Sequence, residues 1–185
     1  MALSFPSTGT QRTLFSAAAR ATPTNAKVRR FLGVLYLNRR DHERAKAEFE
    51  AAYRIYPQFP DLLGPMGLLY FRMGDWRRAE QFMENALRSS GGRDNPLYDE
   101  MAANYAALLM QTGRLEAALP ILDRIIAESP LFSRAYSNRA VIHYRRNNWG
   151  TAQADAQAAL QLDPENDQAK AVLSRISGSS KAGKQ

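Results

Sequence analysis

Apolar and small residues return along this chain at the spacing of one helix pair. The segment 32–57, LGVLYLNRRDHERAKAEFEAAYRIYP, holds a leucine–glycine pair, an aromatic residue, further apolar positions and a closing proline. The same order of residue types returns 34, 73 and 107 residues later. Apolar residues three and four apart within each segment are typical of a buried helix face. A fixed period of this length predicts stacked helix pairs.

Small residues occupy two positions of every repeat, one in each helix of the pair. They are Gly33, Gly67, Ala106 and Ala140 in the first helices, and Ala45, Ala79, Ala118 and Ala152 in the second. We expect these positions to let the paired helices approach closely, with larger side chains filling the space around them. Pro57, Pro130 and Pro164 are expected to end the second helices.

The pattern predicts helix pairs at 26–38 with 42–55 and at 61–73 with 76–89. A third pair should combine a helix that ends near 112 with one at 115–128, and a fourth should combine 132–146 with 149–162. The stretch SSGGRDNP interrupts the period, and Asp94 or Asn95 would cap the helix that follows it. A last amphipathic helix is expected at about 166–176.

These recurring residues resemble the tetratricopeptide repeat (TPR) family over nearly the whole chain. The resemblance implies an all-α fold, a right-handed α-solenoid superhelix of antiparallel helix pairs. The expected organisation is one solenoid domain, with repeats at 26–59, 60–93, 99–132 and 133–166 and an insertion at 94–98. A single repeat cannot bury its apolar face, so stacking supplies the continuous core.

The two ends of the chain are expected to differ from the repeats. Residues 1–10 are rich in Ser, Thr, Gly and Pro and are predicted to be disordered, whereas 11–25 match the second helix of a repeat. That half-repeat is either a native cap or the remainder of a repeat in a longer polypeptide. Residues 167–176 are predicted to form a capping helix, and 177–185 a disordered tail.

The composition of the chain excludes several kinds of site and segment. The chain has no cysteine, so disulfides and thiolate chemistry are excluded within it. No apolar run reaches the ~18 residues of a membrane span, and the first residues lack the features of a secretory signal. We therefore expect no membrane insertion and a cytoplasmic location by default.

The chain carries a formal net charge of +7, and its pI near 9.9 invites a nucleic-acid hypothesis. Most of the basic residues, however, alternate with Glu on outward helix faces, as in RDHERAKAEFE, which is typical of solvated surface. No nucleic-acid partner is expected. The charge is uneven, with +4 over 26–59 and −4 over 94–132.

Catalytic chemistry has little support. The two histidines are His42, expected at the surface, and His143, which stands where Tyr36 and Tyr70 stand and is expected to be packed. None of the common metal-protease, phosphate-loop or nucleophile-elbow motifs occurs. We expect neither an enzyme nor a cofactor within these residues.

In proteins that resemble this one, the first helices line a concave groove that holds peptides. Mapping the matching helix positions onto this sequence gives the candidate groove residues Lys27, Arg30, Val34, Leu37, Asn38, Leu68, Phe71, Arg72, Ala107, Met110, Gln111, Arg134, Val141, Tyr144 and Arg145. The alternative for Leu37, Phe71 and Met110 is that they pack between repeats. The residues that clamp chaperone carboxylate tails in some family members are not matched here.

The leading hypothesis is a protein–protein interaction module that binds an amphipathic peptide with acidic residues. A second hypothesis is the accessory TPR domain of a larger membrane-associated enzyme, because LFSAAARATPTNAKVRRFLGVLY is similar to the start of the TPR tail in bacterial glycosyltransferases. A third is self-association, in which the acidic third repeat of one copy meets the basic first repeat of another.

Overall fold

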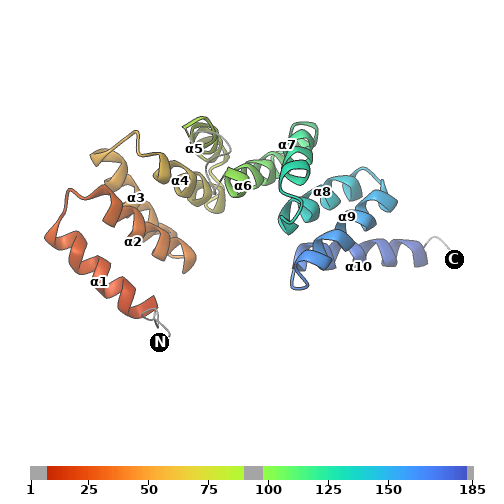
Figure 1. Ribbon diagram of the computed structural model, residues 1–185, viewed down its shortest axis with the longest axis horizontal. Helices are drawn as coiled ribbons and strands as arrows, with labels where there is room; N and C mark the ends of the chain where they lie inside the picture. Colours follow the sequence, from red (N-terminus) through yellow and green to blue (C-terminus); the bar gives the residue numbers. More distant parts are fainter. Residues whose placement is uncertain (1–7, 90–97, 183–185) are drawn as a thin grey trace. The chain divides into compact units, whose positions relative to one another are not determined.

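The computed structural model describes residues 8–89 and 98–182, which belong to two compact units, Met1–Ser90 (unit 1) and Gly91–Gln185 (unit 2). Their regular structure is entirely α-helical (Figure 1). Unit 1 contains α1 (Thr8–Ala21), α2 (Ala26–Asn38), α3 (His42–Ile55), α4 (Pro60–Arg72) and α5 (Trp76–Ser89). Unit 2 contains α6 (Tyr98–Gln111), α7 (Leu115–Glu128), α8 (Ser133–Arg145), α9 (Trp149–Leu162) and α10 (Asp167–Ala182).

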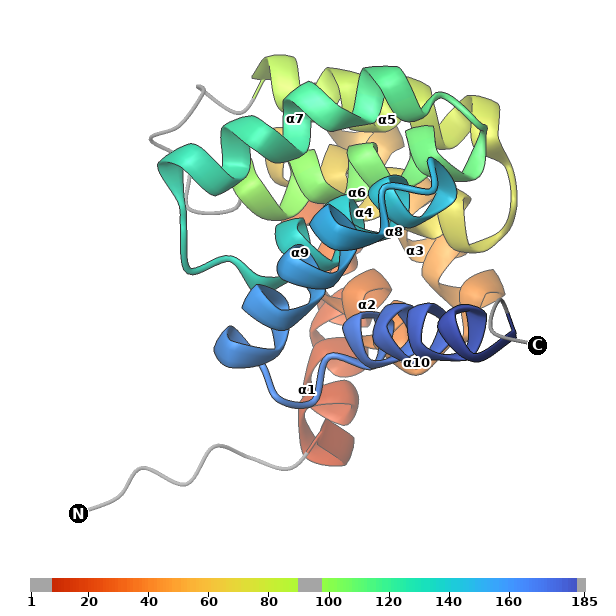
Figure 2. The same ribbon diagram turned by 90° about the vertical axis from the view of Figure 1, so that its right-hand side faces the viewer.

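Each repeat is a pair of helices packed side by side. The pairs are α2 with α3, α4 with α5, α6 with α7 and α8 with α9, and short turns join their members (Figures 1 and 2). The all-α solenoid of helix pairs predicted from the sequence is confirmed. The insertion in the sequence coincides with the border between the two units. A single solenoid domain across that border stays a prediction.

Every turn within a pair has one residue in the left-handed backbone region. Gly74 and Gly113 have φ of 78° and 79°, and Arg40 and Asn147, at the same repeat position, have φ of 61°. The residue after each of them donates a backbone hydrogen bond to the last turn of the first helix, as Asp75 does to the Tyr70 carbonyl at 3.0 Å. This left-handed step ends the first helix and reverses the chain direction.

The small residues lie at close helix contacts, as the sequence predicts. A Cβ built on Gly33 would lie 2.3 Å from the ring atoms Cδ1 and Cε1 of Phe49, on the partner helix. A Cβ on Gly67 would lie 2.6 Å from Cγ of Met83. Ala45, in the second helix of the first repeat, is fully buried.

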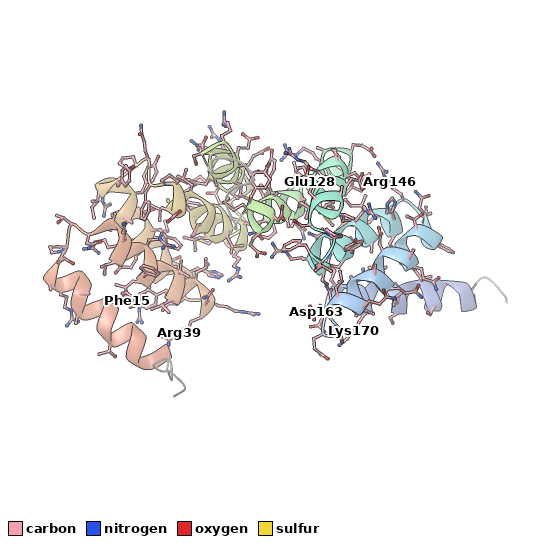
Figure 3. The ribbon with its side chains drawn as sticks, in the orientation of Figure 1. Phe15, Arg39, Glu128, Arg146, Asp163 and Lys170 are labelled. Carbon is pink, nitrogen blue, oxygen red and sulfur yellow. The ribbon has the colours of Figure 1, made fainter. Side chains whose placement is uncertain are left out.

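Most helix bounds match the sequence prediction within one residue, but the ends of the chain do not. Residues 8–10 were predicted to be disordered and instead begin α1, whose Phe15 ring stacks on Phe31 of α2 with centroids 5.3 Å apart (Figure 3). Residues 177–182 were assigned to a disordered tail and instead continue α10. The capping positions Asp94 and Asn95 lie outside the described residues.

Helix α10 extends beyond the predicted capping helix, and the apolar side that anchors it lies within the predicted cap. Ala169, Val172 and Ile176 are buried against α8 and α9, and Leu173 is partly buried beside them. Asn166 caps the helix by accepting a hydrogen bond from the Ala169 N–H at 3.0 Å. Once these turns nucleate the helix, each further residue adds a backbone hydrogen bond without a new nucleation cost, and the helix continues through residues 177–182.

Candidate functional site

The candidate residues form one stripe on each of the first helices α2, α4, α6 and α8. The ligand face of unit 1 is the candidate set on α2 and α4, and the ligand face of unit 2 is the set on α6 and α8. Residues three, four and seven apart share one side of a helix, so each stripe is continuous along its helix. Hydrogen bonds between neighbouring first helices, described below, show that the two stripes within each unit are adjacent.

In unit 1 the structure separates the candidate residues by exposure. Leu37 is only 2 % exposed and is part of the core, so its side chain is not accessible to a ligand. Val34, Leu68 and Phe71 are half-buried. The Phe71 ring meets the exposed Trp76 edge-on, with centroids 5.6 Å apart. The accessible apolar part of this face is therefore Val34, Leu68 and Phe71.

In unit 2 Met110 is likewise part of the core, and Ala107, Val141 and Tyr144 are half-buried. Val141 and Tyr144 pack against the core formed by α8, α9 and α10. Asn38 of unit 1 and Gln111 here are both exposed at the ends of their helices.

Two candidate arginines have a structural role that the sequence prediction missed. Arg72 Nη1 donates to the Leu37 carbonyl at 3.1 Å, and Arg145 Nη1 donates to the Met110 carbonyl at 3.0 Å. Each arginine thereby places its charge at the carboxyl end of the preceding first helix, where a cation is favoured. The equal spacing of 35 residues is the sequence signal that could have revealed this contact.

The remaining basic candidates differ between the units. Arg134 forms an ion pair with Glu100 at 2.8 Å and also donates to the Glu100 backbone carbonyl at 3.0 Å. Lys27 is exposed, and neither it nor Arg30 forms an ion pair in the described part of the chain. The Arg30 guanidinium lies over the rings of Phe31 and Phe59, at 4.5 and 5.7 Å from their centroids. Lys27 and Arg30 of unit 1 are therefore the basic candidates that form neither an ion pair nor a hydrogen bond within the described part of the chain.

Unit 2 also contains a charged network that the sequence reasoning did not identify. Arg139 on α8 donates Nε and Nη2 to the two carboxylate oxygens of the buried Asp155 on α9, both at 2.8 Å, and Nη1 to Asp123 on α7 at 2.7 Å. These hydrogen bonds, chiefly the pair to Asp155, hold the pKa of Arg139 above its ordinary value. His143 Nε2 lies 4.0 Å from Asp155. These side chains bond to one another across three helices. We therefore assign the network the structural role of holding those helices together.

The histidines are half-buried. His143 meets the expectation of a packed residue, whereas His42 was expected at the surface. Each has a buried ring nitrogen, Nε2 of His42 and Nδ1 of His143, without a hydrogen-bond partner among the described residues. Among the described residues, no group of three or more His, Cys, Asp or Glu side chains is arranged to hold a metal ion. No helix in the described ranges has the length and apolar character needed to cross a membrane. The absence of a catalytic site stays a prediction.

Comparisons with known proteins agree with the repeat geometry. Tetratricopeptide repeat profiles match residues 12–60, 70–142 and 133–166. The anaphase-promoting complex subunit CDC16 of Saccharomyces cerevisiae is 22% identical over 163 residues, covering 87% of this chain and 19% of CDC16. The chain thus spans about a fifth of that relative's length.

Solved structures show the same fold at low sequence identity. The APC/C hetero-tetramer Cut9–Hcn1 contains a chain with TM-score 0.82 and 19% identity, covering 91% of this chain and 33% of that one. YrrB, described as a TPR protein with an unusual peptide-binding site, gives TM-score 0.69 and 18% identity, covering 90% and 84%. These structures share the fold, and the matched repeat profiles, which together span most of the described chain, show that the chain belongs to the tetratricopeptide repeat family.

Proposed function

We propose that this protein is an interaction scaffold whose unit 1 ligand face binds an amphipathic, acidic segment of a partner protein. One observation carries the proposal: half-buried Val34, Leu68 and Phe71 share a face with Lys27 and Arg30, two cations that no carboxylate of the described chain neutralises. Aromatic anchors usually dominate such interfaces, while charges at the rim mainly affect the rate of association.

The unit 2 face is the weaker candidate for an acidic partner. Its Arg134 is already paired with Glu100, and Tyr144 contributes to the core of that unit. A ligand would have to displace an ion pair to use Arg134, and this removes part of the gain. We therefore place the main contact on unit 1.

Affinity capture followed by quantitative mass spectrometry tests the proposal. Proteins retained by the unchanged chain should be lost with Phe71→Ala and with Lys27→Glu. They should be retained by Leu162→Ala, which truncates an exposed apolar side chain on a second helix. Once a partner segment is identified, titration should show a loss of about 1–3 kcal/mol for Phe71→Ala.

The structure also guides the choice of control. Arg72 is unsuitable for charge reversal because it caps the end of α2, so a loss of binding could reflect a damaged fold. The double variant Arg54→Glu with Arg88→Glu changes two exposed residues of second helices instead. If that variant loses the captured proteins while Phe71→Ala and Lys27→Glu retain them, the ligand face is not the binding site.

A further inference from the structure

A cleft of about 510 Å³ opens in unit 1 between the α1–α2 turn and the α3–α4 turn. One wall is apolar and comes from Ile55, Tyr56 and Phe59 at the end of α3 and the start of α4. Ile55 and Tyr56 remain 39 % and 50 % exposed, and the Tyr56 ring stacks on Phe59 with centroids 5.7 Å apart. The first helix of the repeat contributes Lys27 to the lining.

The other wall is polar and partly satisfied by its own turn. Thr22 Oγ1 donates to the Ala18 carbonyl at 2.8 Å, and Asn25 Oδ1 accepts from the Val28 N–H at 3.2 Å. Thr24 lies between them in the lining. This wall therefore offers a hydroxyl and an ammonium group beside an aromatic surface.

The equivalent turns of unit 2 are joined directly. Ser133 Oγ donates to the Ala159 carbonyl at 2.9 Å and accepts from Asn166 Nδ2 at 3.0 Å. In unit 1 the matching positions are Ala26 and Phe59, whose side chains cannot form these bonds. Unit 1 therefore lacks the hydrogen bonds that join these turns in unit 2, and its cleft stays open and apolar.

Charge at the cleft is uncompensated as well. Lys27 in the lining is exposed. Arg30 is outside the lining but lies over the ring of Phe59, and its buried Nε has no hydrogen-bond partner among the described residues. The adjacent Arg29 is different, because its guanidinium already pairs with Glu48 at 2.9 Å. Asp61, two residues after Phe59, forms no ion pair with Lys27 or Arg30. The exposed Lys27 ammonium is the donor in the lining that a carboxylate can reach, and the Arg30 guanidinium adds positive charge beside the Phe59 ring.

We propose that this cleft is a subsite for an aromatic side chain followed by an Asp or Glu within an internal segment of a partner protein. The aromatic ring packs on Tyr56, Ile55 and Phe59, and the carboxylate pairs with Lys27 and Arg30. The inference deepens the proposed function by extending the unit 1 face to its edge, and it rests on that function for the identity of the partner as a protein. An internal segment suits a cleft that is open between two turns, since a chain can enter and leave it.

The probe is phenylacetate, titrated into the full chain and followed by ¹H–¹⁵N NMR. Amide signals of residues 22–27 and 55–59 should shift in a saturable way, and phenylacetamide, the neutral analogue, should bind about fivefold or more weakly. Lys27→Gln and Arg30→Gln should remove that preference, whereas Arg77→Gln, an equal loss of charge on α5, should keep it. Tyr56→Ala should weaken both probes alike. Equal affinity for the two probes, or shifts elsewhere, would overturn the subsite.

Two N-acetylated peptides of equal length and equal net charge then test the source of the carboxylate. One carries an internal Phe-Asp pair, and the other carries its acid as a free C-terminal carboxylate after Phe. The internal pair should bind more tightly, and tighter binding of the free terminus would refute the internal segment. Phe71→Ala separates this inference from the proposed function, because it should weaken partner binding while leaving phenylacetate unaffected. If the Phe71→Ala protein binds phenylacetate and also keeps its partner, the result contradicts the ligand face but not the subsite.

Discussion

Gly33 and Gly67 show how a single hydrogen atom in place of a methyl group sets the distance between two helices. At Gly33 the atoms in the way belong to the ring of Phe49, which is fully buried and cannot move aside. At Gly67 the nearest atom is Cγ of the flexible Met83 side chain, and the Met83 backbone nitrogen lies 3.2 Å from the same Cβ position. The two positions look equivalent in the sequence, and only the packing distinguishes them.

We expect Gly33→Ala to lower the free energy of unfolding by about 2–3 kcal/mol, since overpacking a well-filled contact costs up to about that much. Gly67→Ala should cost less, about 1 kcal/mol, because Met83 can adopt another rotamer. Gly150→Ala is the control, because a Cβ built on Gly150 has no neighbouring atom within 4 Å. Urea unfolding followed by circular dichroism measures all three. Equal losses of unfolding free energy in Gly33→Ala and Gly150→Ala would mean that the close contact with Phe49 is absent.

Asp155 provides a second test at the residue scale. Its carboxylate is buried and accepts two hydrogen bonds from Arg139, so Asp155→Ala leaves that guanidinium with Asp123 alone. We expect a loss of ~3 kcal/mol in the free energy of unfolding, the low end for breaking a buried pair. Asp123→Ala removes the partner whose side chain is 56% exposed, and should cost about 0–1 kcal/mol. The reverse order in urea unfolding would contradict the assigned network.

At the scale of elements, the repeat period and the prolines were enough to predict helix bounds. Helices α3, α7 and α9 end two residues before Pro57, Pro130 and Pro164. The extent of α10 could not be predicted, because Ser and Gly after Ile176 are typical of a tail and only contact with α8 and α9 nucleates the helix. The sequence left open whether Leu37 and Met110 are buried or accessible, since each lies next to an exposed residue on the edge of its stripe.

The turns within helix pairs give a prediction for Arg40, which has the left-handed φ of 61° without being glycine. That conformation costs an L-residue ~1–2 kcal/mol, and the greater freedom of glycine in the unfolded chain offsets part of the gain. Arg40→Gly should therefore raise the free energy of unfolding by about 0.5–1 kcal/mol. Asn147→Gly should change it little, because asparagine tolerates this region. A destabilised Arg40→Gly protein would show that the turn is not strained.

At the scale of the whole molecule, the sequence predicted the family and the basic character but not which cations are free. Alternation of Arg with Glu suggested a solvated surface, and many basic residues are indeed paired, as Arg29 is with Glu48 and Arg134 with Glu100. Whether a cation finds a partner depends on the neighbouring helix. Lys27 and Arg30 could be singled out only after that neighbour was placed.

The formal net charge of +7 should act over a longer range than these local pairs. The screening length is ~30 Å at 0.01 M salt and ~8 Å at 0.15 M, so distant charges attract an acidic segment only at low salt. Stopped-flow association of a peptide with an internal Phe-Asp pair should slow as salt is raised. Arg54→Glu with Arg88→Glu should slow association at low salt and match the unchanged chain at high salt.

Lys27→Gln should behave differently, because its charge lies beside the bound carboxylate and is screened much less. It should weaken equilibrium binding at both salt concentrations, and this loss should persist where the distant pair no longer matters. Arg77→Gln is the matched control, because it removes one positive charge away from the cleft. If Lys27→Gln and the distant pair lose their effects together as salt rises, the attraction comes from net charge alone and the carboxylate does not bind beside Lys27.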